Sequence, residues 1–332
     1  MNNLLKKLYV EPSSLCNLNC KMCFRNGWIN EKRELMSDVI WKSVLCSIPY
    51  CRDLETVMFA GMGEPLTHPG IFNMIKSVAK LGVRTHLLTN GTMLDRNCTD
   101  ELIDSGLDML WVSVDGFSRE SYEKIQIGSR YDLILENLKY FSSRKGRCKL
   151  GITFVIMREN ESELYKINNF SDMTGADEIN LSYAIPSFPI KARNSLYDSK
   201  IPVGKMKRLG NDIEKRKLNC CPFVDEGVSF VKSNGDVCPC MQLLHSSYTY
   251  LFEEKRKVLS CSFGNVSENL LNDIWQSETY DAFRKRVYNF EFPDCTLCDG
   301  CDDRLENKKD CMFNTFPTCG ACLWAQGAAR CP

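Results

Sequence analysis

Three cysteines stand close together near the N-terminus, in the segment SSLCNLNCKMCF at residues 13–24. Cys16, Cys20 and Cys23 are spaced four and then three residues apart. A closed zinc site and a closed four-iron cluster each need four thiolate or imidazole ligands. Three thiolates can instead hold three irons of a four-iron cluster and leave the fourth iron open for the amino and carboxylate groups of a substrate. The alternatives are three buried thiols, or a zinc site completed by one of the three histidines, His68, His86 or His245.

A second concentration of cysteines lies near the C-terminus. Of the 19 cysteines, seven fall in residues 1–219 and twelve in residues 220–332. The start of the chain has no signal-peptide core, so a secreted disulfide framework is not expected, and dense CxxC spacing indicates metal or iron–sulfur ligation. The candidate metal ligands are Cys221, Cys240, Cys295, Cys298, Cys301, Cys311, Cys319, Cys322 and Cys331. We expect Cys220 and Cys261 to be structural or spare, and Cys46, Cys51, Cys98 and Cys148 to be ordinary thiols.

Charge and hydropathy argue against several classes of partner. The 332 residues carry 42 basic and 42 acidic side chains, so there is no general electrostatic reason to expect binding to nucleic acid or to an anionic membrane. No apolar run reaches the roughly 18 residues that a transmembrane helix needs. We therefore expect a cytoplasmic protein with neither nucleic acid nor membrane as partner.

Short apolar runs alternate with helical patterns over residues 1–185. The runs predict strands at residues 7–11, 56–61, 85–90, 110–115, 152–157 and 178–185. Capping residues and spacing predict helices at residues 38–48, 69–82, 100–106, 130–146 and 161–170. Six consecutive strand–helix units predict an α/β fold in which a parallel sheet forms a partial (β/α)6 barrel of the TIM type, since eight units would close a full one. Polar and glycine-rich segments follow the strands, and this carboxyl edge is where such folds build active sites.

The chain divides into three parts on this pattern. The partial barrel takes residues 1–185, a bridging segment with one basic helix takes residues 186–219, and a small cysteine-rich domain takes residues 220–332. The last part contains an expected hairpin, GVSFVKSNGDV, with an Asn-Gly turn at 234–235, and helices at 269–277 and 279–290. It has few long apolar runs, so we expect it to fold around its ligated metal. The barrel begins within about ten residues of Met1, so no leader-binding domain is expected before it.

Five motifs at the strand ends resemble those of one family. CNLNCKMC resembles the CxxxCxxC signature of radical S-adenosylmethionine enzymes, and GMGEP (61–65) is similar to the family motif whose backbone and glutamate meet the amino group of the methionine moiety. TNGT (89–92), SVDG (113–116) and MREN (157–160) match further segments of this family. The resemblance implies that Cys16, Cys20 and Cys23 are catalytic and hold a [4Fe-4S] cluster. It also implies that S-adenosyl-L-methionine contacts Gly61, Met62, Gly63, Glu64, Pro65, Thr89, Asn90, Ser113, Asp115 and Asn160.

The tail resembles SPASM domains, which bind auxiliary four-iron clusters. Its opening motif places thirteen residues between Cys221 and Gly235 and four between Gly235 and Cys240. The family pattern continues as CxxC, five residues, Cys, three residues, Cys and a last Cys. Here Arg304 stands at the third of these positions, so Cys301, Cys311 and Cys319 remain alternatives. The resemblance implies three [4Fe-4S] clusters, one that binds S-adenosylmethionine and two auxiliary ones.

The resemblance implies a radical S-adenosylmethionine oxidoreductase or maturase. Such an enzyme cleaves S-adenosylmethionine reductively to a 5′-deoxyadenosyl radical, which abstracts hydrogen from a peptide, a protein or a protein-bound cofactor. An electron donor of the flavodoxin or ferredoxin type would supply the electron. The closing run at residues 307–332 resembles maturases associated with tungsten-cofactor oxidoreductases, and this role is favoured.

Two other functions remain open from the sequence. One is a peptide epimerase, or a synthase that forms thioether or carbon–carbon crosslinks in peptides; it would use the same barrel, with a cysteine such as Cys261 as a hydrogen donor. The other is a non-catalytic iron–sulfur electron carrier or metal-binding interaction module. That second function explains the cysteine-rich tail but leaves the strand-end motifs of the barrel unexplained.

Overall fold

The computed structural model describes residues 4–184, 204–207, 219–251, 254–296, 298 and 300–325. The basic helix expected within residues 186–219 and the candidate ligand Cys331 lie outside these described residues.

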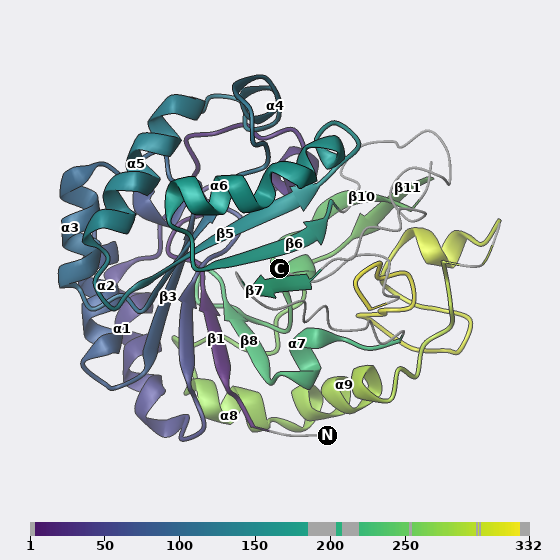
Figure 1. Ribbon diagram of the computed structural model, residues 1–332. Coiled ribbons are helices and arrows are strands. Elements are labelled where there is room, and N and C mark those ends of the chain that lie inside the picture. Colours follow the sequence, from purple (N-terminus) through teal and green to yellow (C-terminus); the bar gives the residue numbers. More distant parts are fainter. Residues whose placement is uncertain are drawn as a thin grey trace.

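Six parallel strands form the centre of the molecule (Figure 1). They lie side by side in chain order, and every neighbouring pair is parallel. They are β1 (Lys7–Val10), β2 (Thr56–Phe59), β3 (Arg84–Thr89), β4 (Met109–Ser113), β5 (Lys149–Ile156) and β6 (Glu178–Tyr183). The predicted α/β fold and all six predicted strands are confirmed, with bounds that shift by one to three residues.

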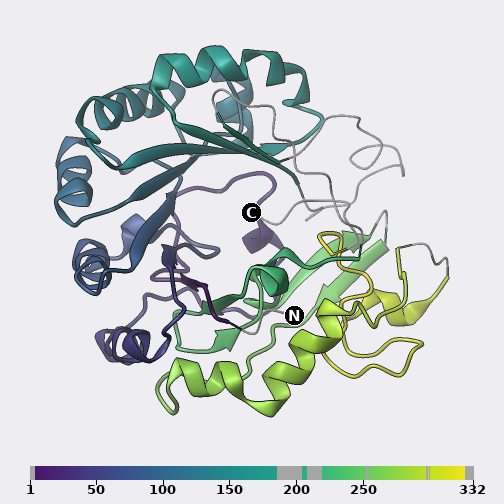
Figure 2. The same cartoon turned by 60° about the horizontal axis from the view of Figure 1, so that its bottom comes forward.

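Helices cover the outer side of this curved sheet (Figure 2). The capping signals work as the sequence indicates: the Ser37 hydroxyl accepts a hydrogen bond from the Ile40 N–H at 3.3 Å, and Gly82 and Gly106 follow helices with φ of 76° and 86°. The helices are α1 (Asp38–Ser47), α2 (Ile71–Ala79), α3 (Arg96–Asp104), α4 (Arg119–Ile125), α5 (Tyr131–Arg144) and α6 (Ile167–Thr174). Short 3-10 helices are Phe24–Gly27, Ile48–Tyr50, Pro65–Thr67, Glu161–Lys166, Met241–Leu243 and Asp302–Leu305.

The sheet continues beyond the six expected strands, to nine in the order β7-β6-β5-β4-β3-β2-β1-β8-β9. β7 (Gly204–Lys207) runs antiparallel to β6, and β8 (Val228–Val231) runs parallel to β1. β8 and β9 (Val237–Cys238) form the predicted hairpin, in which Gly235 has a φ of 92°. The first strand of the cysteine-rich part therefore belongs to the barrel sheet, which the sequence did not predict.

The rest of the cysteine-rich part packs at the open end of the sheet (Figure 2). It contains α7 (Pro222–Asp225), β10 (Ser247–Leu251), β11 (Glu254–Val258), α8 (Leu271–Gln276) and α9 (Glu278–Tyr288). The buried Trp324 meets Phe24 and Phe223 edge-on, with ring centres 6.0 and 6.3 Å apart. One hydrophobic core thus runs from the barrel into the tail. None of the helices in the described residues is both long and apolar enough to span a membrane.

Candidate active site and cluster sites

The predicted cysteine trio forms one loop at the carboxyl end of β1. Cys16, Cys20 and Cys23 are each partly exposed. Burial raises the pKa of Cys20, and the nearby Asp115 carboxyl and the other two thiols raise it further. Burial also raises the pKa of Cys23, while the neighbouring Arg25 lowers it. Three thiols close enough to influence one another's protonation are the donor set that can hold three irons of one four-iron cluster.

The loop after β3 holds the cysteine loop in place through side-chain amides. The Asn90 amide donates to the Cys16 sulfur at 3.7 Å and to the side-chain Oδ1 of Asn17 at 2.9 Å. The Asn17 amide in turn donates to the Thr92 hydroxyl at 2.7 Å. The structure thus brings Asn90, predicted as a cofactor contact, directly against a predicted cluster ligand.

The loop after β2, with Gly61, Met62, Gly63, Glu64 and Pro65, packs against the segment that leads into Cys16. The Glu64 N–H donates to the Leu15 carbonyl at 2.6 Å. A Cβ atom on Gly63 would lie 2.2 Å from the Ser13 carbonyl oxygen, so this close approach requires glycine. The two motifs, 37 residues apart at their nearest ends in the chain, therefore form one continuous surface.

The Glu64 side chain is buried and hydrogen-bonded to other groups of the protein. It is 2% exposed, and its carboxylate accepts hydrogen bonds from the Leu66 N–H, the Thr89 hydroxyl and the Asn90 N–H at 3.0, 2.7 and 2.7 Å. Burial raises the pKa of Glu64, and these three donors oppose the rise. Glu64 therefore ties the loops after β2 and β3 together, and a direct contact of its side chain with the cofactor stays a prediction.

Ser113 and Asp115 lie at the carboxyl end of β4, on the same edge as the cysteine loop. The Asp115 carboxyl accepts from the Val155 N–H at 2.8 Å and from the Ser113 hydroxyl at 3.3 Å. Burial raises the pKa of Asp115 to about 7, against the effect of these two hydrogen bonds. A buried carboxyl with such a perturbed pKa beside the cysteine loop is typical of a functional site.

Asn160 is hydrogen-bonded to the backbone of Asp115 and of the neighbouring strand β5. It is 0% exposed, and its amide donates to the backbone carbonyls of Asp115 and Val155, both at 2.9 Å. Gln126, which the sequence did not single out, is also buried and accepts from the Asp115 N–H at 3.0 Å. Both amides fix the strand ends, so a direct cofactor contact by Asn160 stays a prediction.

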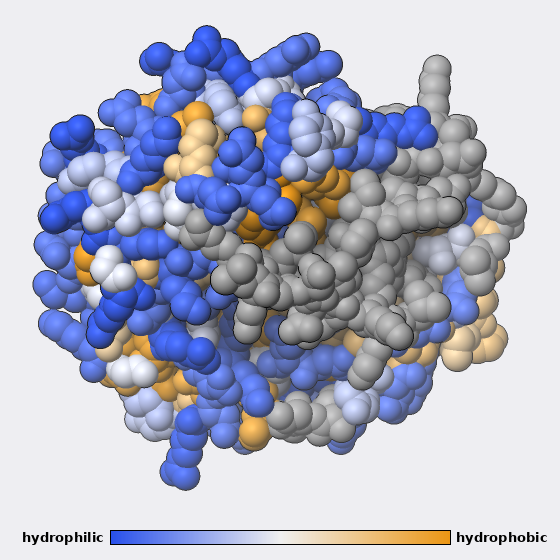
Figure 3. Space-filling view, viewed as in Figure 1, coloured by the Kyte–Doolittle hydropathy of each residue, from blue (hydrophilic) through white to orange (hydrophobic). Residues whose placement is uncertain are grey.

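A small apolar cluster, separate from the main core, lies beside the cysteine loop. Ile125, Met157 and Ala184 are buried there, with Met22 and Val155 packed against them. Figure 3 shows hydrophobic residues in orange near the middle of the face seen in Figure 1, where β5 and β6 end. An apolar wall at the carboxyl edge limits the access of water to the site.

Four partly exposed tail cysteines come together in a first group: Cys221, Cys240, Cys319 and Cys322. Burial raises the pKa of Cys221 to about 12, with a further rise from Cys322. Burial also raises the pKa of Cys240, and the nearby thiols of Cys221, Cys319 and Cys322 add to that effect. The sequence left Cys319 as one of three alternatives, and the structure places it in this group.

A second group surrounds Cys295. Burial raises the pKa of Cys295 to about 11, and the neighbouring Asp310, Cys298 and Cys311 raise it further. Cys301 is partly exposed and lies at the start of the 3-10 helix Asp302–Leu305. Cys295, Cys298, Cys301 and Cys311 remain the predicted ligands of this second group.

Arg256, on β11, lies close to both tail groups. It is 3% exposed, and the thiols of Cys322, Cys319 and Cys295 counteract the lowering of its pKa by burial. Its Nε donates to the Arg304 carbonyl at 3.0 Å, and no ion pair of Arg256 with a carboxylate occurs within the described residues. A buried cation between two groups of thiols suits anionic clusters held by those thiols.

No three described His, Cys, Asp or Glu side chains converge where a single metal ion could bind them all. Thiolates that hold a four-iron cluster bind different irons, so they need not converge on one point. Cys220 and Cys261 are not assigned to either group of tail thiols. The Cys220 thiol contacts the Asp225 carboxylate at 2.6 Å, and Cys261 is buried at 8% exposure.

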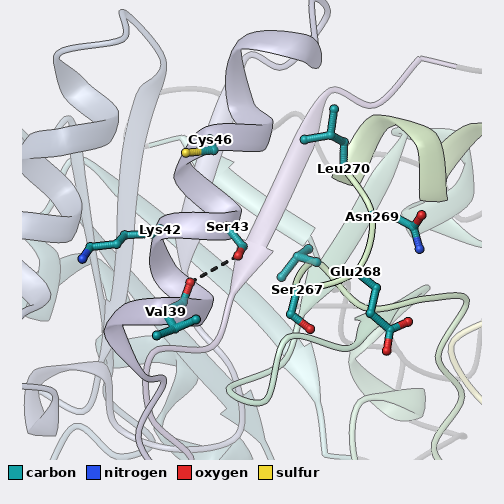
Figure 4. Close-up of a pocket in the computed structure, with 9 residues that line it drawn as sticks. Val39, Lys42, Ser43, Cys46, Ser267, Glu268, Asn269 and Leu270 are labelled. Carbon is teal, nitrogen blue, oxygen red and sulfur yellow. Dashed lines mark hydrogen bonds between the residues drawn. The ribbon is translucent and has the colours of Figure 1, made fainter.

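A cavity of about 470 Å³ lies elsewhere, between α1 and the segment 266–270 (Figure 4). Val39, Ser43 and Cys46 line one wall, and Glu268 and Leu270 line the other. Its lining includes none of the predicted site residues, and we assign it no part in the chemistry.

The comparisons with known proteins bear directly on this arrangement. The model of the radical SAM superfamily matches residues 10–170, and that of the SPASM iron–sulfur cluster-binding domain matches residues 220–302. A curated Pyrococcus furiosus protein, the tungsten-containing aldehyde ferredoxin oxidoreductase cofactor-modifying protein, is 31% identical over 99% of this chain and 97% of its own. The chain belongs to the radical SAM superfamily. It is thus a radical SAM enzyme with a SPASM domain, which implies iron–sulfur clusters and S-adenosylmethionine and rules out the non-catalytic carrier.

Solved structures confirm the fold of this radical SAM enzyme. Native anSMEcpe with bound AdoMet has a TM-score of 0.62 at 16% identity, over 88% of this chain and 86% of that one. Streptococcus suis SuiB bound to its precursor peptide SuiA has a TM-score of 0.61 at 17% identity, over 85% and 67% of the two chains. At these identities the similarity establishes the architecture.

Proposed function

We propose that this radical SAM enzyme is a maturase that modifies a protein-bound cofactor, with tungsten-cofactor oxidoreductases as the favoured clients. The observation that carries the proposal is the 31% identity that extends over 99% of the chain, tail included, to the Pyrococcus furiosus protein named for cofactor modification. Similarity confined to the barrel would support the reaction type alone. The close approach of the two parts, through β8 and Trp324, is consistent with a client handled by both.

We assign the catalytic cluster to Cys16, Cys20 and Cys23. S-adenosylmethionine would lie against Gly61, Met62, Gly63 and Pro65, with Thr89, Asn90, Ser113 and Asp115 around it. When bound there, the cluster and S-adenosylmethionine supply an electron and a 5′-deoxyadenosyl group able to abstract hydrogen from the client. The protein's own part is to fix the loops through Glu64 and Asn160 and to keep water out with the apolar cluster around Met157.

We assign two auxiliary [4Fe-4S] clusters to the tail. The group of Cys221, Cys240, Cys319 and Cys322 would supply the four thiolates that one closed cluster needs. Cys295, Cys298, Cys301 and Cys311 would hold the other. Closed ligation of both favours electron relay over direct binding of the client, and a flavodoxin- or ferredoxin-type protein is the expected electron donor.

The test begins with anaerobically reconstituted protein. We expect about twelve irons per chain in the wild-type protein and about eight in a variant with Cys16, Cys20 and Cys23 all changed to Ala, because two clusters remain. Zinc in place of iron would contradict the assignment.

Turnover then tests the client. With reductant and S-adenosylmethionine, 5′-deoxyadenosine release should rise when a cofactor-loaded tungsten oxidoreductase, or its isolated cofactor, is added. The Cys20→Ala protein is the control and should release none. A rise with a precursor peptide alone would instead favour the peptide epimerase or crosslink-forming alternative.

A further inference from the structure

A buried histidine of the tail lies beneath the proposed cofactor loop of the barrel. His245 is 1% exposed, and both of its ring nitrogens face carboxylates. Nε2 lies 2.9 Å from a Glu11 carboxylate oxygen, and Nδ1 lies 2.9 Å from a Glu31 carboxylate oxygen. A carboxylate accepts hydrogen bonds, so with Glu11 and Glu31 ionised both ring nitrogens donate and the ring is an imidazolium.

Glu11 transmits this contact to the loop after β2. It is 1% exposed, and its Oε1 accepts from the Met62 N–H at 2.8 Å. A Cβ atom on Gly61 would lie 2.4 Å from the Glu11 Cγ, so the loop rests directly on this side chain. The chain of contacts therefore runs from His245 through Glu11 to the backbone of Gly61 and Met62.

Glu31 and Trp28 connect the same histidine to the segment that follows the cysteine trio. The Trp28 ring stacks on the His245 ring at a centre-to-centre distance of 4.4 Å. Glu31 also pairs with Lys232 at 2.7 Å and accepts from the Ser246 N–H at 2.7 Å. Two carboxylates and two cations balance in charge, which offsets the cost of burying Glu11 and His245 and of partly burying Glu31 and Lys232.

We propose that His245 is a positioning residue for S-adenosylmethionine: through Glu11 it fixes the loop of Gly61 and Met62, and so makes cofactor binding in the barrel depend on the tail. The inference rests on the proposed placement of S-adenosylmethionine at this loop. It is independent of which client the enzyme modifies.

The sign of the pH effect follows from the groups around the ring. Burial lowers the pKa of His245, but the hydrogen bonds with Glu11 and Glu31 outweigh it and raise the pKa above the ordinary value. Hydrogen bonds from His245 and Lys232 hold the pKa of Glu31 at about 2, against the effect of burial. Glu11, Glu31 and Lys232 are the charged groups that face the ring, and the Cys238 thiol lies near Glu11. As the pH rises through the raised pKa of His245, one carboxylate loses its donor and the loop loses its support.

The experiment measures S-adenosylmethionine affinity by optical titration of the reconstituted protein from pH 6 to 9, together with reductive cleavage in the absence of client. We expect His245→Gln to weaken binding about tenfold at pH 7, since the glutamine amide has both N–H donors on one nitrogen and presents an acceptor oxygen in place of the second ring donor. KM for S-adenosylmethionine should rise while kcat at saturation stays near the wild-type value. The matched control is His86→Gln, a partly exposed histidine within β3 that lies outside the proposed cofactor loops, which should leave KM unchanged.

Glu31→Gln provides a second variant, in case His245→Gln folds poorly. Loss of one carboxylate lowers the pKa of His245, so the weakening of binding at alkaline pH should begin at a lower pH than in the wild-type protein. A residue with a purely structural role would lower the melting temperature and leave KM and this pH profile unmoved. Wild-type affinity in both variants across the pH range overturns the inference alone. A wild-type protein that fails to bind S-adenosylmethionine overturns both the inference and the proposed function.

Discussion

Gly63→Ala is the sharpest test of the contact between the two barrel motifs. The added Cβ would lie 2.2 Å from the Ser13 carbonyl oxygen and 2.5 Å from the Leu15 carbonyl oxygen, whereas ordinary contact begins at 3.4 Å. Both obstacles are backbone, which cannot rotate away as a side chain does. The loop and the segment leading into Cys16 must therefore separate by roughly 1 Å, a displacement that can cost about 100-fold in rate when it misplaces reacting groups.

The cost in stability follows from the same contacts. Overpacking of this kind typically costs about 1–3 kcal/mol. Separation also weakens the 2.6 Å hydrogen bond from the Glu64 N–H to the Leu15 carbonyl, which adds about 1 kcal/mol. We therefore expect Gly63→Ala to lower the free energy of unfolding by about 2–4 kcal/mol and to weaken S-adenosylmethionine binding by at least tenfold.

Gly70→Ala is the matched control seven residues along the chain. Gly70 has an ordinary φ of −92°, and its Cβ would meet only the His68 side chain, at 3.2 Å. We expect a loss of under about 1 kcal/mol, mainly from the weaker N-cap, and wild-type affinity. Chemical denaturation and optical titration measure both quantities. If Gly63→Ala matches Gly70→Ala in stability and in affinity, the reasoning from close approach is refuted.

Two further predictions concern the tail. Arg256→Met should lower the reduction potential of at least one auxiliary cluster by about 50–100 mV, because a buried positive charge favours the more negative reduced state of the cluster. A potentiometric titration followed by EPR measures the potential, and Lys255→Met, at an exposed position on the same strand, is the control. Equal potentials in the wild-type protein and Arg256→Met would contradict the placement of Arg256. Burial raises the pKa of Cys261 to about 11, so its thiol is protonated at pH 8, and iodoacetamide should label it far more slowly than the exposed Cys46 in the native protein, as peptide mass spectrometry would show.

The strands of the barrel could be predicted because each is a short apolar run bounded by polar or glycine residues. The run TVMF becomes β2 with all four residues buried, and the polar and glycine residues that follow it form the loop proposed to bind S-adenosylmethionine. β8 could not be assigned to the same sheet. Val228–Val231 has the same apolar character, but its partner β1 lies more than 200 residues earlier, and apolar character alone does not choose between distant partners.

The same limit applies to the site. Strand-end motifs place Cys16, Glu64, Asn90 and Asp115 at one edge, since parallel strands end together. What each side chain does there depends on its hydrogen-bond partners, and those of Glu64 and Asn160 lie within the protein. Among the tail cysteines, spacing left three alternatives for one position. Cys319 joins the group of Cys221 because the tail folds back onto Cys221, which stands almost 100 residues earlier in the chain.

Long-range contacts join the radical SAM barrel to the cysteine-rich tail. β1 carries the strand end that leads into the cysteine trio, and it pairs with β2 on one side and with β8 of the tail on the other. Removal of the tail would leave β1 as an open edge and would leave the buried Glu11 carboxylate without His245. An uncompensated buried charge directly under Met62 would disturb the loop on which S-adenosylmethionine is proposed to bind. The tail therefore completes the sheet and pairs the buried Glu11 carboxylate with His245, so we expect the barrel alone to bind S-adenosylmethionine more weakly than the whole chain.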